Sequence, residues 1–126
     1  MKHEELTRQI IGCAYKVFNT LGFGFLEGVY KKAMLIELER SKLKAEPEKS
    51  LKVYYDNQVV GDFYVDLLVE QEIIVELKSV QKLAKEHEVQ LVNYLNGLDK
   101  EIGLLINFGS NGVDVKRKYR RAAEES

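Results

Sequence analysis

Alternating apolar and polar residues between positions 63 and 78 constrain the fold of this chain more than any other stretch. Two apolar arms flank the polar residues 70–72, and every odd position of both arms is apolar, which is typical of two antiparallel strands joined by a short turn. Slippage by one residue would carry one arm's apolar set to the opposite face, so odd positions must pair with odd positions. This register places Asp66 directly across from Glu76, with Lys78 next on the same face.

Asp66, Glu76 and Lys78 have two interpretations. They could coat the solvent-exposed face of a half-buried hairpin, where polar and apolar residues normally alternate. Opposed carboxylates repel, however, unless a cation lies between them, and Leu68 and Ile74 indicate that another element covers the same face. Charges that are covered need partners. The stretch therefore predicts a cation site, with a solvated hairpin face as the alternative.

Length and composition limit the class of protein. The 126 residues are 45% hydrophobic and 31% charged, which is typical of one globular domain with its own core. The net charge of −1 gives no overall attraction for nucleic acid, so such binding would depend on local patches or metal ions. The single cysteine, Cys13, excludes an internal disulfide framework and a cysteine-based zinc site. No apolar run reaches transmembrane length and the charged start is no signal peptide, so we expect a cytoplasmic protein without membrane association.

The periods of the remaining apolar residues predict the other elements. Helices are expected over residues 4–21, 26–41 and 81–97. Strands are expected over residues 50–55, 58–69, 73–78, 102–108 and 113–115. Gly22 and Gly24 end the first helix and Gly97 ends the third, while Pro47 marks an irregular start of the first strand and Asp56–Asn57 a turn. The strand over 102–108 is apolar almost throughout, so we expect it to be buried on both faces.

His87, Gln90 and Tyr94 are polar members of an otherwise apolar stripe in the third predicted helix. Their spacing of three and four residues makes them neighbours on one helix face. A helix that follows the third strand would pack across the sheet, so these side chains could point at the carboxylates. The alternative is a satisfied buried network or the wet edge of the stripe, and for His87 we favour it.

Two further features have ordinary structural explanations of their own. Glu27 falls in the first turn of the second helix, where a carboxylate stabilises the unpaired N–H groups. Near the C-terminus, five cations surround one aromatic ring: Lys116, Arg117, Lys118, Tyr119, Arg120 and Arg121. Such a run can contact phosphates while the ring stacks on a base. The commoner interpretation is a solvated end, so we expect residues 116–126 to form a frayed basic tail.

Three motifs in order make the chain resemble the GxxExxY family of the PD-(D/E)XK nuclease superfamily. Gly24, Glu27 and Tyr30 match the G-x-x-E-x-x-Y pattern. Asp66 followed by Glu76-Leu77-Lys78 is similar to the D…E-x-K motif, and Gln90 to Tyr94 is similar to the Q-x-x-x-Y helix motif of exonuclease-like branches. Residues 103–109 also resemble the family's penultimate strand, and the resemblance covers residues 10–118.

The resemblance implies a fold and a site. The fold would be α/β with a restriction-endonuclease-like core, in which helices flank a mixed central sheet with an antiparallel three-stranded meander, as a single domain over residues 1–126. Mg²⁺ or Mn²⁺ would be held by Asp66, Glu76, Glu27 and the carbonyl of Leu77. Lys78 would orient the attacking water and stabilise charge on the phosphate, and Gln90 and Tyr94 would position the metal-site residues or a phosphate. Tyr30 and His87 would support the site.

The resemblance also implies a function: a metal-dependent nuclease that hydrolyses phosphodiester bonds in nucleic acid, with DNA favoured over RNA. One alternative is a non-catalytic module that retains the nuclease fold and binds nucleic acid or protein. Another is a metal-dependent hydrolase of smaller phosphate esters. A domain of this size has little surface with which to bind a nucleic-acid duplex, so a homodimer or a partner subunit could supply the remaining contact surface.

Overall fold

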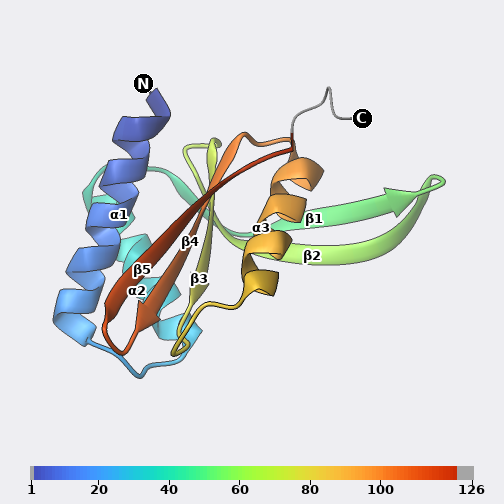
Figure 1. The fold of residues 1–126 in the computed structure, drawn as a ribbon. Coiled ribbons are helices and arrows are strands. Elements are labelled where there is room, and N and C mark those ends of the chain that lie inside the picture. Colours follow the sequence, from blue (N-terminus) through green and yellow to red (C-terminus); the bar gives the residue numbers. More distant parts are fainter. Residues whose placement is uncertain (1, 122–126) are drawn as a thin grey trace.

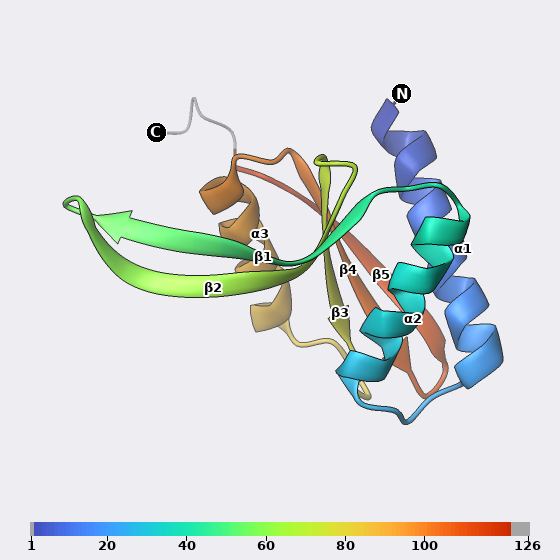
Figure 2. The same ribbon diagram turned by 180° about the vertical axis from the view of Figure 1, so that it is seen from behind.

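The computed structural model describes residues 2–121, which form three helices and five strands. The helices are α1 (Lys2–Leu21), α2 (Glu27–Arg40) and α3 (Lys85–Leu98). The strands are β1 (Ala45–Tyr55), β2 (Gln58–Val69), β3 (Ile73–Lys78), β4 (Ile102–Gly109) and β5 (Gly112–Tyr119). All five strands join one sheet, with α1 and α2 packed on one face and α3 on the other (Figure 1, Figure 2). None of the helices between residues 2 and 121 is long and apolar enough to cross a membrane.

The strands follow one another across the sheet in the order β1-β2-β3-β4-β5. β1, β2 and β3 form an antiparallel meander, β3 and β4 are parallel, and β4 and β5 are antiparallel. A parallel pair cannot be joined by a tight turn, and α3 supplies the necessary crossover between β3 and β4. The predicted fold class, a mixed sheet with an antiparallel meander flanked by helices, is confirmed.

Both faces of the sheet are buried. Leu67, Val69 and Val75 pack against α1 and α2, whereas Leu68 and Ile74 pack against α3. Every residue of β4 is buried, as its apolar run predicted. Leu68 and Ile74 alternate with Leu67, Val69 and Val75 and therefore point to the opposite face. They are apolar because α3 covers that face.

The β2–β3 hairpin has the predicted register and turn. Leu67 pairs with Val75 and Val69 pairs with Ile73, so odd positions oppose odd positions. The three-residue connection turns through the left-handed backbone region at Glu70 and Gln71, where φ is 55° and 59°. Register and turn therefore agree, as they must when both faces of a strand pair are packed.

The expectation that the odd positions of residues 63–69 all face one core is wrong for the two positions ahead of Asp66. Val65 packs with Leu51 in the core under α3, and Phe63 is exposed. β3 pairs only with residues 67–69 of β2, so β1 and β2 continue beyond it as a two-stranded arm that extends past α3 (Figure 1). Glu48, which falls opposite Asp66 in the β1–β2 register, has a left-handed backbone with φ of 55°. The β1–β2 pair therefore departs from regular strand geometry at the position of Glu48 and Asp66.

Other predicted element boundaries are also wrong, and the third helix begins at Lys85 instead of residue 81. β1 begins at Ala45, ahead of Pro47, because β1 is an edge strand and a proline there removes no required ladder bond. α3 continues past Gly97 to Leu98 and ends with Asp99 in the left-handed region. Gly97 serves close packing instead, since a Cβ at this position would lie 2.8 Å from Leu51 Cδ1.

The prediction of a frayed basic tail is wrong for its first residues. β5 reaches Tyr119, which pairs with Ile102, and Lys116 pairs with Leu105. β5 continues beyond the predicted residues 113–115 because it pairs with the fully buried β4 along its whole length. The remaining predicted tail, residues 122–126, lies outside the described residues.

Candidate active site

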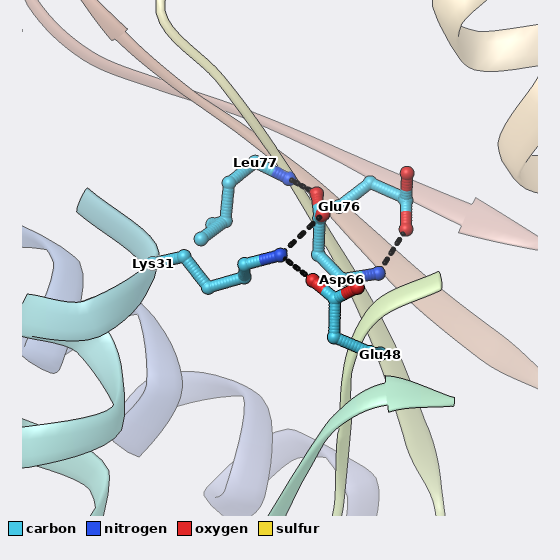
Figure 3. A network of polar contacts seen from close by, with 5 residues as sticks. All are labelled: Lys31, Glu48, Asp66, Glu76 and Leu77. Carbon is cyan, nitrogen blue, oxygen red and sulfur yellow. Dashed lines mark hydrogen bonds and ion pairs between the residues drawn. The ribbon is translucent and has the colours of Figure 1, made fainter. Parts of the chain in front are cut away.

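Asp66 and Glu76 lie at the point where β2 and β3 separate. They follow the last paired residues, Leu67 and Val75, in the same register. Here each carboxylate accepts a hydrogen bond from the backbone of the neighbouring strand: Asp66 N–H donates to Glu76 Oε2 at 2.7 Å, and Leu77 N–H donates to Asp66 Oδ2 at 2.8 Å (Figure 3). Both side chains are thereby held at fixed places near one another.

Glu76 is the buried member of this pair, with 7% of its surface exposed. Burial, followed by the negative charge of Asp66, raises the pKa of its carboxyl to about 8, although the Asp66 N–H and Lys78 oppose the shift. Glu27 adds a smaller repulsion that also raises the Glu76 pKa. The fold thus gathers Glu27, Asp66 and Lys78 around Glu76, and the ionised form of Glu76 needs positive charge for stability.

Lys31, on α2, is a member of this cluster that sequence reasoning missed. Its ammonium lies between two carboxylates: it donates to Glu48 Oε2 and lies 3.7 Å from Asp66 Oδ1 (Figure 3). These contacts, the one with Glu48 above all, raise the Lys31 pKa against the effect of burial. The Glu76 carboxylate points away from Lys31 in the same view. Lys31 lies four residues after Glu27 and hence on the same helix face, which was the signal available in the sequence.

The G-x-x-E-x-x-Y segment forms a loop that leads into α2. Gly22 and Gly24 have φ of 73° and 118°, a region that favours glycine. Tyr30 is fully buried, donates to the Gly22 carbonyl at 2.5 Å and stacks on Phe108 with ring centroids 4.3 Å apart. Tyr30 therefore holds the loop, while Glu27, the first residue of α2, stays exposed.

Tyr94 is the residue of α3 that faces the carboxylates. It is buried, and its pKa is raised by burial and then by the charges of Glu76 and Asp66. Gln90, one turn earlier, is exposed and lines a groove of about 570 Å³ between the β1–β2 arm and α3, which Tyr94 and Phe63 also line. The helix thus brings Tyr94 to the acidic cluster and Gln90 to the neighbouring groove.

His87 has the structural explanation that its sequence context favoured. Its Nδ1 accepts a hydrogen bond from the Ala84 N–H at 3.1 Å, which satisfies a free donor at the start of α3. The half-buried ring therefore fixes the helix end.

Part of the predicted basic run is paired within the molecule. Lys118 forms an ion pair with Glu88 at 3.0 Å, and Arg120 pairs with Asp99. Arg121 lines the groove that contains Gln90. β5, which carries Lys116 to Tyr119, forms the sheet edge opposite β1, so the cations are spread over that edge and the end of α3.

The donor set at the β2–β3 divergence fits a hard divalent cation. Asp66 and Glu76 offer carboxylate oxygens, and the buried Glu76 requires charge compensation when it ionises. Among residues 2–121, no three or more histidine, cysteine, aspartate or glutamate side chains are grouped closely enough to hold a metal by themselves. Such a site would keep several waters, which suits Mg²⁺.

Comparison with known proteins assigns this chain to a superfamily. Residues 4–122 match the family model described as PD-(D/E)XK nuclease superfamily, and the chain belongs to that superfamily. A solved structure named "Crystal structure of SSO0001" is similar over 78% of this chain, with a TM-score of 0.58 and 17% sequence identity. This chain spans about half of that one, 52%, and the likeness concerns the fold. A comparison with curated proteins finds no match. The restriction-endonuclease-like architecture expected from the sequence is consistent with both similarities.

Proposed function

We propose that this protein is a divalent-metal-dependent nuclease that hydrolyses phosphodiester bonds in nucleic acid. The observation that carries the proposal is the Asp66–Glu76 pair, which backbone N–H groups hold together at the divergence of β2 and β3 beside Lys78. Membership of the PD-(D/E)XK nuclease superfamily supports nuclease function. Assignment to the GxxExxY family and a cytoplasmic location stay predictions from the sequence.

Four groups would hold Mg²⁺ or Mn²⁺: the carboxylates of Asp66 and Glu76, the carbonyl of Leu77 and, from α2, Glu27. When bound, the metal lowers the pKa of a coordinated water and polarises a phosphoryl oxygen. Lys31, which pairs with Asp66, would have to release that carboxylate. The backbone bonds to Asp66 and Glu76 limit their motion, so little reorganisation would be needed.

Lys78 would orient the attacking water and stabilise negative charge on the phosphate. Tyr94 would position Glu76, and Gln90 would position a phosphate or base in the groove beside it; the coupling of Tyr94 to Glu76 supports this pair of roles. Tyr30 and His87 would act indirectly, through the loop before Glu27 and through the start of α3.

Nucleic acid is the substrate we propose, with DNA favoured over RNA. The contacts to phosphate would come chiefly from Lys116 and Arg117 on β5 and from Arg121 at the groove. Lys118, Tyr119 and Arg120 would contribute less, since Lys118 and Arg120 have acidic partners.

A second function, a non-catalytic binding module, is favoured by one observation. Lys31 neutralises Asp66 from within the protein, as a structural ion pair would. In such a module the acidic cluster would serve only to hold α2 against the sheet.

The test combines metal binding with cleavage. Wild type, Asp66→Asn and Glu76→Gln are titrated with Mg²⁺ and Mn²⁺ by calorimetry, and each is incubated with single- and double-stranded DNA and RNA. Both substitutions keep a carbonyl acceptor for the backbone N–H but remove the charge, so we expect folded proteins that have lost metal binding and cleavage. Cleavage that persists in both variants would refute the site, and a wild type that binds no metal and cuts no substrate would favour the binding module.

A further inference from the structure

The outer part of the β1–β2 hairpin, residues 50–64, projects from the body of the protein as an arm (Figure 1, Figure 2). It ends in a two-residue turn at Asp56 and Asn57, both with positive φ, which is the geometry that continues a hairpin's twist. Seven large apolar side chains on the arm are between 39% and 75% exposed: Val53, Tyr54, Tyr55, Val59, Val60, Phe63 and Tyr64. An exposed apolar surface of this kind on a soluble domain marks an interaction site.

The apolar side chains occupy both faces of the arm. Tyr54 lies opposite Val59 on one face, and Val53 lies opposite Gly61 on the other, because directly paired residues share a face. Among the described residues, α3 covers the base of the arm, where Leu51 packs beneath the helix and Phe63 contacts Tyr94 with ring centroids 5.9 Å apart. A partner that lies flat against one face would contact only the side chains of that face, whereas a strand paired to the edge contacts side chains on both faces.

The charges of the arm argue against phosphate as the partner. Its one cation, Lys52, forms an ion pair with Asp62 at 3.1 Å, and Asp56 at the tip leaves the arm with a net negative charge. Single-stranded nucleic acid is bound where aromatic rings accompany a positively charged groove, and anionic lipid surfaces likewise attract basic segments. A protein surface is the remaining partner of matching chemistry.

The outer edge of β1 is suited to pairing with a copy of itself. β1 is the first strand of the sheet, so within residues 2–121 no strand lies beside one side of its backbone. Pro47 protects the beginning of this edge, but residues 50–55 contain no proline and no unpaired charge. Two identical edges can pair antiparallel about a two-fold axis, which is the commonest symmetry of protein dimers.

The exposed side chains supply part of the area that a dimer needs. Four of the seven are aromatic, and an aromatic side chain buries about 150–250 Å² when fully covered, so with the three valines they provide on the order of several hundred Å² per copy. A stable interface buries about 800 Å² per partner. Edge pairing adds the backbone and the remaining side chains of the arm to this apolar area.

We infer that the arm is a self-association surface, through which two copies of this chain pair β1 against β1 and pack the tyrosines and valines of their arms together. The pairing extends the sheet from one copy into the other and brings the exposed side chains of the two β1 strands side by side on both faces. It does not rest on the nuclease proposal, because the acidic cluster contributes none of its residues, although Val53 and Phe63 also line the groove that contains Gln90.

Sedimentation and light scattering over a roughly hundredfold range of micromolar concentration test the inference. The arm variant combines Tyr54→Ser, Val59→Thr and Val60→Thr. The control combines Ile36→Thr and Tyr119→Ser, which remove equally exposed apolar side chains from α2 and β5. We expect wild type and control to be dimers and the arm variant to be monomeric, or to dissociate at least tenfold more readily. Far-ultraviolet circular dichroism establishes that all three are folded.

A cross-link locates the contact. Cys13 is buried, so Val53→Cys adds the one accessible thiol, near the middle of the free edge. A short bis-maleimide should join two copies through residue 53, whereas Ile36→Cys should give no cross-linked dimer. A wild type that is monomeric throughout, an arm variant that dimerises as wild type does, or an arm that instead mediates binding of a monomer to oligonucleotides or lipid vesicles would overturn the inference.

Discussion

The titration of Glu76 should make the stability of the protein depend on pH, because burial and Asp66 raise the pKa of its carboxyl in the folded protein to about 8. In an unfolded chain a glutamate has a pKa of about 4.3. The folded state therefore holds this proton more tightly, and its stabilising contribution is complete below about pH 4.3 and is lost as pH rises to about 8. In chelator-containing buffer, Glu76→Gln and wild type should have similar free energies of unfolding at about pH 4. At about pH 9 the free energy of unfolding of Glu76→Gln should be higher by on the order of a few kcal/mol.

Urea unfolding at several pH values measures this difference. Glu39→Gln, on an exposed part of α2, is the matched control and should follow wild type at every pH. Parallel pH profiles for Glu76→Gln and wild type would show that the Glu76 carboxyl is not held in a charge-excluding environment.

Lys31 gives a second prediction at the residue scale, and it rests on the proposed metal site. Its ammonium neutralises Asp66, so a metal must compete with it for that carboxylate. Lys31→Met should strengthen Mn²⁺ binding up to about fivefold, since a partly exposed ion pair contributes about 1 kcal/mol or less. Calorimetry measures the effect, with the exposed neighbour Lys32→Met as control. Weaker Mn²⁺ binding by Lys31→Met would mean that Lys31 orients Asp66 rather than competing for it.

At the scale of elements, Tyr30 joins the loop before α2 to the core. Its hydroxyl donates to the Gly22 carbonyl and accepts from the Phe25 N–H at 3.4 Å. Tyr30→Phe keeps the stacking on Phe108 but leaves these groups unpaired, so the free energy of unfolding should fall by about 1–2 kcal/mol. Chemical denaturation measures the loss, with the exposed Tyr15→Phe on α1 as control. Equal stability of both variants would show that the loop does not depend on this hydroxyl.

At the scale of the whole molecule, a net charge of −1 leaves nucleic-acid binding to local cations. Arg121 lines the groove beside α3, whereas Arg120 is paired with Asp99. Arg121→Ala should therefore weaken DNA binding and lower the salt dependence of its affinity by about one phosphate contact, and Arg120→Ala should change both less. Fluorescence anisotropy at several salt concentrations distinguishes the two. Identical slopes for wild type and Arg121→Ala would remove the groove from the proposed DNA path.

The β2–β3 register and the three-residue turn could be predicted from the amino-acid pattern, because both faces of this hairpin are packed and a slip would bury the wrong side chains. The apolar pattern alone therefore brings Asp66 and Glu76 together. Contacts between distant elements set three features that the pattern does not contain: Val65 turns to the other core, β1 and β2 leave the sheet as an arm, and Lys31 reaches Asp66 from α2. Apolar periodicity reports which face of one element is buried, and it carries no information about how far a strand outruns its neighbour or which distant side chain meets a carboxylate. Packing between elements far apart in the chain settles those questions.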